Sequence, residues 1–325
     1  MMKTNTPSKV LALFVADLHL SLTPPPFRSA ESDWLAAQQR PLDELTSLQE
    51  KHNGAPIFCA GDIFDKWYVT HDKSRGASEL INWAMEHLPY MHCIPGQHDL
   101  PEHDLEQIER SAYWTLVKAS VINNLPRVNG FTSHQWPGLV LHSFPFGTKV
   151  TSRENLTGRD IRIALIHEYN WIDGHIYNVQ SSERLALGGK HVNKDRKEFD
   201  GYDLVVSGDN HNPFHCVIGK TQFWNCGTFM RRKSDERDYR PQIGMLMSDG
   251  SMKAHYLDTS QDKCLDVAEA EELEKIPDMD LSDLIEGLGQ LGECALDFGD
   301  AMKRQLARNP ANKRVRSILW KAIES

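Results

Sequence analysis

The feature that most constrains the fold is an apolar run from Val10 to Val15, followed closely by Asp17 and His19. The run is short and partly β-branched, which is typical of a buried β-strand. Asp17 and His19 are two residues apart, so both side chains can point the same way beyond the strand's end. The pattern predicts a core strand that presents a carboxylate and an imidazole at the edge of a sheet.

The same arrangement occurs four more times along the chain. Apolar runs end in Asp, His or amide side chains at Gly61–Asp65, Gly96–Asp99, Ile166–Glu168 and Gly208–His211. Helical spacing of apolar residues separates the first three runs, which predicts a β-α-β-α-β order. Open α/β sheets place ligands at the carboxyl ends of their strands. We therefore expect the five clusters to form one metal site.

The residue types suit a site that holds two ions. Asp62 has two carboxylate oxygens and could bridge two cations. Asp17 and His19 could complete the shell of one ion, and His167 could bind the other. Asp209 alternates with His211 along the chain, so each could bind a different ion.

Carboxylate and imidazole ligands without thiolate suit manganese, magnesium, iron or zinc, and manganese is the first choice. A bridged pair of ions about 4 Å apart generates hydroxide near neutral pH and neutralises phosphoryl oxygens. A phosphate ester is the substrate that needs both effects.

His98 directly follows Gln97 and need not bind metal itself. It could reach a scissile phosphate and protonate the leaving oxygen. That role requires a partner for its other ring nitrogen, and Asp65 is the candidate. A carboxylate in the turn after a strand can instead cap the next helix, which is the structural alternative for Asp65.

Composition limits the classes of partner and compartment. The 325-residue chain has a formal net charge of −9, which argues against a general coat of positive charge for binding polyanions. The basic run Arg231–Lys233 and the lysines around Lys194 could be solvated surface or local phosphate contacts. The six cysteines form no C-x-x-C pair, which favours a reduced, cytoplasmic protein. No apolar stretch is long enough to span a membrane.

The five clusters, in this order, resemble the metallophosphoesterase (calcineurin-like phosphoesterase) superfamily over roughly residues 9 to 230. The resemblance implies an α/β fold in which a two-sheet β-sandwich is flanked by helices, the four-layer arrangement of that superfamily. Within it, Gly61–Asp65, Trp67 and the long helical tail look most like SbcD-type DNA exonuclease subunits, including short phage-type versions.

The resemblance also implies a role for each cluster residue. One ion would be held by Asp17, His19, Asp62 and His211. The other would be held by Asp62, Gln97, His167 and Asp209. His98 and Asp65 would form the acid pair.

Two positions depart from the pattern of that superfamily. Gln97 stands where Asn is usual, which places the amide oxygen one methylene farther out. Asp209 stands where His is usual, and with Asp17 and Asp62 it raises the number of proposed carboxylate ligands to three. Extra negative charge favours hard cations, so we expect manganese or magnesium to be preferred over zinc.

These observations predict a nuclease domain at residues 1–260 and a helical C-terminal region at 261–325. The expected function is metal-dependent hydrolysis of DNA phosphodiester bonds in repair, recombination or replication. By resemblance, partners include DNA, an SbcC-type ATPase subunit and a second copy of the chain. The alternatives are a phosphatase or phosphodiesterase for nucleotides or other small phosphoesters, and a catalytically silent binding module.

Overall fold

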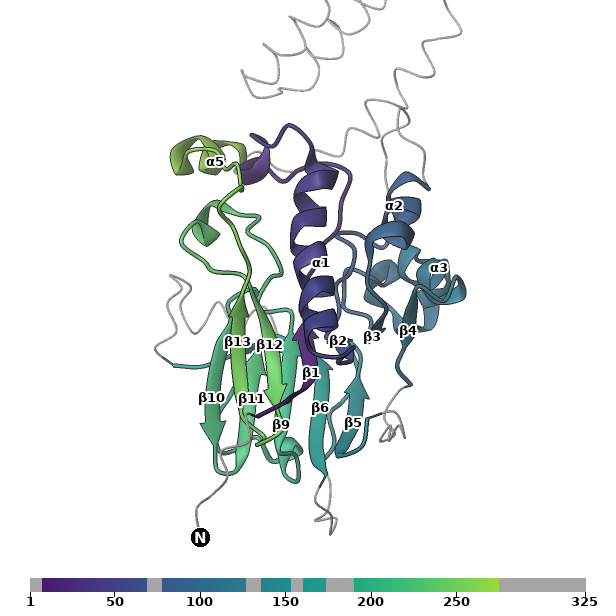
Figure 1. Ribbon diagram of the computed structural model, residues 1–325, viewed down its shortest axis with the longest axis vertical. Coiled ribbons are helices and arrows are strands. Elements are labelled where there is room, and N and C mark those ends of the chain that lie inside the picture. The colour runs from purple at the N-terminus through teal and green to yellow at the C-terminus, as the bar shows by residue number, and fades with distance from the viewer. Residues whose placement is uncertain (1–7, 69–77, 127–135, 153–159, 174–189, 275–325) are drawn as a thin grey trace, which may run out of the picture. The chain divides into compact units, whose positions relative to one another are not determined.

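A computed structural model describes residues 8–68, 78–126, 136–152, 160–173 and 190–274 (Figure 1). Its core is two β-sheets. The first has the strand order β13 (Met252–Tyr256), β12 (Gln242–Met247), β1 (Val10–Val15), β2 (Ile57–Cys59), β3 (Met91–Cys93), β4 (Ile122–Asn124). The second has the order β10 (Phe214–Ile218), β11 (Thr221–Asn225), β9 (Leu204–Gly208), β6 (Ile161–His167), β5 (Leu139–Phe144).

Parallel pairing brings the polar clusters to one edge of the sandwich. Strands β1 to β4 are mutually parallel, as are β5, β6, β9 and β11. A small parallel pair, β7 (Asn170–Trp171) and β8 (Lys190–His191), follows β6. The carboxyl ends of β1, β2, β3, β6 and β9 are the points where the five sequence clusters begin.

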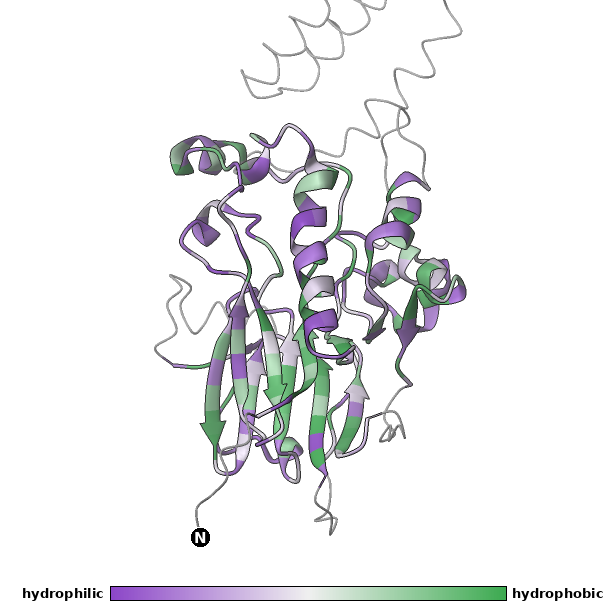
Figure 2. Ribbon diagram, viewed as in Figure 1, coloured by the Kyte–Doolittle hydropathy of each residue, from purple (hydrophilic) through white to green (hydrophobic). Residues whose placement is uncertain are grey.

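Strand β1 is buried on both faces, which explains its continuous apolar sequence. Leu13 and Val15 pack beneath the helices in one hydrophobic cluster. Ala12 and Phe14 point into a second cluster that also contains Leu165 of the other sheet, so this cluster is the interior of the sandwich. Figure 2 shows the resulting concentration of hydrophobic residues along the strands.

Helices α1 (Trp34–Lys51), α2 (Glu79–His87) and α3 (Ala112–Lys118) supply apolar residues to the cluster on the first sheet's outer face. Asp33 caps α1 by accepting a hydrogen bond from the Ala36 N–H group. Two multi-strand sheets flanked by helices confirm the predicted fold class.

The sequence also predicts one helix over Glu102–Val117, and here the structure differs. It consists of 3-10 turns at Pro101–His103 and Leu105–Arg110, followed by α3. Glu102 and His103 have positive φ angles of 52° and 60°, which no α-helix accommodates. The Ser111 side chain then caps α3, so the α-helix begins only there.

The described residues up to Glu271 belong to one compact unit. Helix α5 (Val267–Glu274) is the last described element, and most of the predicted region 261–325 lies outside the described residues. The boundary near residue 260 therefore stays a prediction. Within the described part of the chain, no helix is long and apolar enough to cross a membrane, and Cys59, Cys93, Cys216, Cys226 and Cys264 are free.

Candidate metal centre

The seven predicted ligands are linked to one another at the carboxyl edge of the sandwich. The turns after β1 and β2 run side by side, because the Asp17 and His19 N–H groups donate to the carbonyls of Gly61 and Asp62 at 3.0 Å. The carboxylate of Asp17 in turn accepts from the Asp209 N–H group at 3.0 Å. These contacts join the ends of β1, β2 and β9.

The remaining ligands approach the same point. His167 Nε2 lies 3.4 Å from Asp62 Oδ2, and His19 Nε2 lies 3.8 Å from the same oxygen. The Nε2 atoms of His19 and His211 are 3.0 Å apart. Gln97 Nε2 donates to Asp209 Oδ1 at 2.9 Å. The side-chain amide oxygen of Gln97 is therefore left for another partner.

Asp62 occupies the central place in this arrangement. Among the described residues, two groups of three have ligand atoms within 4.8 Å of one another: Asp17, Asp62 and His167, and His19, Asp62 and His98. Asp62 belongs to both groups, as a bridging carboxylate would. His98 enters the second group through a ring nitrogen, and its main-chain N–H also donates to Asp62 Oδ1 at 2.9 Å.

Several buried atoms of the site lack a hydrogen-bond partner among the described residues, namely Asp62 Oδ2, His167 Nε2 and His19 Nδ1. Buried polar atoms are normally satisfied, so Asp62 Oδ2 and His167 Nε2 fit a site for a bound cation, whereas His19 Nδ1 lies on the Asp65 side of its ring. His167 Nδ1 lies 2.6 Å from the Ala60 carbonyl. That nitrogen must therefore carry the hydrogen, and the lone pair on Nε2 is available to a metal.

The backbone of the site is strained at the ligands themselves. Asp17, His19, Asp62 and Asp209 have φ angles of 53°, 47°, 55° and 79°. Residues with a side chain rarely adopt this left-handed region, and each such residue costs about 1–3 kcal/mol. Strain at four of the predicted ligands indicates that their geometry is maintained for function rather than for stability.

Two glycines allow the side chains to come this close. A Cβ on Gly61 would lie 2.4 Å from His167 Nδ1, and Gly61 has φ 107°. A Cβ on Gly96 would lie 2.1 Å from Asp62 Oδ1. Neither position can accept a larger residue without displacing a ligand.

The electrostatics are those of a cation site. Burial raises the pKa of Asp17 to about 7, against the lowering effect of His167 and His211. Burial alone would lower the pKa of His167, but Asp62, Asp209 and Asp17 together raise it well above its usual value. The carboxylates thus create a potential that favours positive charge at this point.

Asp99 is a structural brace beneath the centre. Its fully buried carboxylate accepts hydrogen bonds from the N–H groups of Ile63, Phe64 and Gly96. Burial raises the pKa of Asp99 to about 7, with Asp62 as the next cause. Asp99 therefore ties the turn after β2 to the turn after β3.

The contact between His98 and Asp65 differs from the expected one. His98 Nδ1 lies 2.7 Å from the main-chain carbonyl of Asp65, not from its carboxylate. The Asp65 carboxylate instead accepts from Arg232 Nη2 at 2.5 Å and lies 3.8 Å from His19 Nδ1. Asp65 still fixes the ring nitrogen of His98, but it does so through its backbone.

The basic run Arg231–Lys233 separates into three different environments. Arg231 forms an ion pair with Asp262 at 3.0 Å. Arg232 is buried and also donates to the His19 carbonyl. Lys233 alone is exposed. The sequence indicated a basic surface here, but nothing in it distinguished these three roles.

Beside the ligands is an open groove of about 440 Å³. Gln97, His98, Asp209 and His211 line its inner side, and Lys233 is the one cationic Lys or Arg side chain among its described lining residues. Glu168, next to His167, is not in this lining and pairs instead with Arg196 and Lys190. The groove therefore gives a substrate direct access to the predicted ligands.

A family model for calcineurin-like phosphoesterases matches residues 11–213, which include all of the predicted ligands. The chain belongs to this superfamily. Its members are hydrolases that act on phosphoesters at a dinuclear metal centre, and the unsatisfied buried atoms and paired ligand groups of this chain fit such a centre. No curated protein matches the chain.

Two solved structures match the chain at low sequence identity. An archaeal phosphodiesterase shares 12% identity with a TM-score of 0.36, covering 76% of this chain and 99% of the other. A proposed 5'-nucleotidase from Staphylococcus aureus, in complex with alpha-ketoglutarate, shares 12% identity with a TM-score of 0.40. That match covers 82% of this chain and 58% of the other.

Proposed function

We propose that this member of the superfamily is a metal-dependent DNA nuclease of the SbcD type, which hydrolyses phosphodiester bonds. The observation that carries the proposal is the charge of the groove. Lys233 is its one Lys or Arg among the described lining residues, and Asp209, Asp235 and Glu236 line it as well. A phosphodiester carries one negative charge, whereas a phosphomonoester carries about 1.5 to 2 near pH 7. At the reacting phosphate the acidic groove therefore favours a diester over a monoester, and its open form leaves room for the groups on both sides of that phosphate.

In such a reaction the residues of the site would have different roles. Bound divalent cations would supply a nucleophile near neutral pH and neutralise charge on the phosphoryl oxygens. The Asp65 carbonyl holds the Nδ1–H group of His98, so the doubly protonated ring would deliver its Nε2 proton to the leaving oxygen and keep the one on Nδ1. Lys233 would contact a phosphate of the substrate strand, because it lines the groove beside the predicted ligands.

Further parts of the proposal concern the metal, the partners and the compartment. We propose manganese as the preferred metal because three acidic ligands favour hard cations. An SbcC-type ATPase subunit, a homodimer and a cytoplasmic location are likewise proposed. The five free cysteines of the described residues suit a reducing compartment.

The test compares three classes of substrate in the presence of Mn²⁺. These are end-labelled duplex and hairpin DNA, bis-p-nitrophenyl phosphate as a small diester, and p-nitrophenyl phosphate as a monoester. We expect both diester classes to be cleaved and the monoester to react at least tenfold more slowly. Faster turnover of the monoester would replace the nuclease with the phosphatase alternative. Cleavage of the small diester without cleavage of DNA would indicate a small-molecule phosphodiesterase.

A further inference from the structure

The segment that follows β11 contains an acidic residue that the sequence patterns did not single out. Glu236 ends a 3-10 turn at Ser234–Glu236, and only 2% of its surface is exposed. A buried carboxylate is stable only when its oxygens are paired. Each of the two oxygens of Glu236 has a different partner.

One carboxylate oxygen of Glu236 binds the main chain of its own loop. Glu236 Oε2 accepts from the N–H groups of Arg232 and Lys233, at 2.5 Å and 3.0 Å. The other oxygen, Oε1, lies 3.4 Å from Nδ1 of His211. Two main-chain donors therefore fix the carboxylate, and the fixed carboxylate faces a predicted metal ligand.

From this geometry we propose that Glu236 is a positioning residue for the metal centre: it orients the His211 ring and makes His211 a stronger ligand. A hydrogen on Nδ1, held by Glu236, leaves the lone pair on Nε2, which lies 3.0 Å from Nε2 of His19. A carboxylate behind an imidazole fixes the tautomer and raises the basicity of the ligating nitrogen.

The two histidines at the ends of the second sheet thus have different partners. His167 has the neutral Ala60 carbonyl at 2.6 Å behind it, whereas His211 has the Glu236 carboxylate. A full negative charge donates more electron density than a carbonyl dipole. We therefore expect Glu236 to strengthen selectively the ion that His211 binds, so that the two ions differ in affinity.

This inference rests on the metal centre of the proposed function, but not on DNA as the substrate. The test therefore measures metal binding, by calorimetric titration of Mn²⁺ into the full-length chain from which metal has been removed. Glu236→Ala should weaken one of two binding steps by about 10–100-fold, the usual effect of losing such a partner. Glu236→Gln keeps one oxygen for the two N–H groups but turns its NH2 group, a donor, toward His211 Nδ1. It should therefore leave the loop's hydrogen bonds in place and still weaken the same step.

A loop-stabilising role alone is distinguished by a double-variant cycle with His211→Ala. If Glu236 acts through His211, then Glu236→Ala should have no further effect on metal affinity in the His211→Ala background. The matched control is Asp238→Asn, two residues away with an 88% exposed side chain, which should bind metal like the parent.

Each outcome has one meaning. Parental affinity in both Glu236 variants would overturn the positioning role, as would equal losses from Glu236→Ala in the presence and absence of His211. Parental affinity in His211→Ala would overturn the ligand assignment itself and the inference with it. If the parent chain binds metal as expected but does not cleave DNA, only the proposed substrate is contradicted.

Discussion

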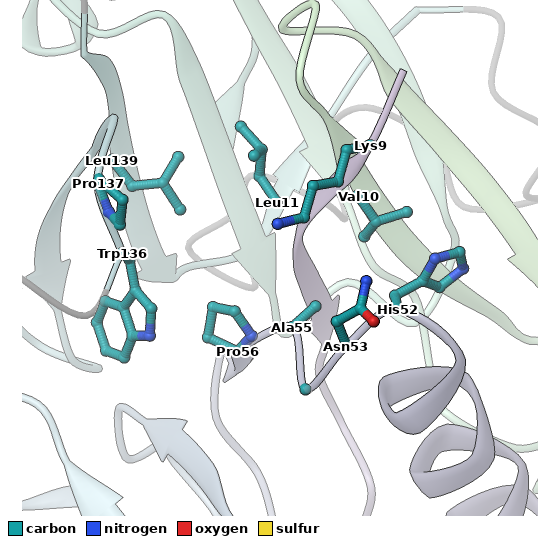
Figure 3. A pocket seen from close by; sticks show the side chains of 11 residues that line it. Lys9, Val10, Leu11, His52, Asn53, Ala55, Pro56, Trp136, Pro137 and Leu139 are labelled. Carbon is teal, nitrogen blue, oxygen red and sulfur yellow. The ribbon is translucent and has the colours of Figure 1, made fainter. Parts of the chain in front are cut away.

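The two ends of β1 open onto hollows of similar size but different chemistry. The groove at the carboxyl end has a volume of about 440 Å³, and the pocket at the amino end about 360 Å³. In the second pocket Trp136 lies on one side and His52 and Asn53 on the other (Figure 3). Cavity size alone would not distinguish the functional end of the molecule.

What distinguishes the two ends is which residues have positive φ angles and how closely those residues are grouped. Asn53 and Gly54 beside the second pocket also have positive φ angles, but Asn and Gly tolerate that conformation where a helix ends. At the metal centre the same conformation is imposed on Asp17, His19 and other ligands. Four residues with positive φ at adjoining strand ends, together with unsatisfied buried atoms, therefore mark the site better than a cavity does.

Two buried histidines show the same contrast. Asp62 and its neighbouring carboxylates raise the pKa of His167 well above its usual value, against the effect of burial. His92 packs against Phe58 and Trp136 with no carboxylate as a cause of its shift, and burial lowers its pKa to about 4. The environment of His167 therefore stabilises a positive charge, whereas the environment of His92 disfavours one.

The largest effect should come from removing the bridging carboxylate. Asp62→Asn should reduce hydrolysis of bis-p-nitrophenyl phosphate by about 1,000-fold or more, because metal ions contribute several kcal/mol of charge stabilisation. The matched variant at the other hollow is His52→Ala, which should retain parental activity. Steady-state rates at saturating Mn²⁺ provide the measurement. Equal losses in the two variants would mean that the two ends do not differ in function.

The second effect depends on the leaving group. His98→Ala should reduce DNA cleavage by about 10²–10⁴-fold, the usual contribution of a general acid. Loss of bis-p-nitrophenyl phosphate hydrolysis should be far smaller, because p-nitrophenolate leaves without protonation. The ratio of the two rates, measured at equal metal occupancy, is the readout. A similar loss on both substrates would assign His98 to metal or substrate binding instead of proton transfer.

The strands could be predicted because their sequence pattern is local. The apolar runs and the polar residues at their ends located the strands, and parallel pairing then brought Asp17, Asp62 and His167 into one group. The prediction failed for Glu102–Val117, because apolar spacing does not reveal the positive φ angles at Glu102 and His103.

The partners behind the ligands could not be predicted for a different reason. Glu236 and Arg232 reach the centre from a loop whose path depends on tertiary packing, and neither belongs to a strand-end pattern. The choice of the Asp65 carbonyl over its carboxylate as the partner of His98 likewise depends on where Arg232 lies. Sequence periodicity carries no information about such contacts.

The third effect concerns stability without metal. Asp17 has a pKa of about 7 in the folded protein, against 3.8 when unperturbed. Between these values the folded state retains a proton that the unfolded state has released, so stability falls as pH rises from about 4 to 7. At pH 8 and with a chelator present, Asp17→Asn should therefore be more stable than the parent, by roughly 2–4 kcal/mol.

Urea unfolding at pH 8 and pH 5 tests this prediction. The stabilisation should fall to about 40% of its pH 8 value at pH 5, where Asp17 of the parent is protonated in the fold but still ionised when unfolded. With saturating Mn²⁺ the order should reverse, because the parent gains binding energy that the variant lacks. A variant less stable than the parent at pH 8 without metal would show that the Asp17 carboxylate stabilises the fold by itself.

The smallest effect should come from His92, in the apolar environment. Its pKa of about 4 in the fold lies below the unperturbed 6.5, so the unfolded state binds the extra proton as pH falls. Stability from this residue is present above pH 6.5 and is lost towards pH 4. Between pH 7.5 and pH 5 the loss should be about 2 kcal/mol. His92→Gln cannot titrate and should lack this part of the pH dependence, as measured by urea unfolding with a chelator present.

Asn123 Nδ2 lies 2.9 Å from Nδ1 of His92, and a glutamine carbonyl can accept that hydrogen bond. An unchanged pH dependence in the variant would mean that His92 is solvated in solution, and the contrast with His167 would then not hold.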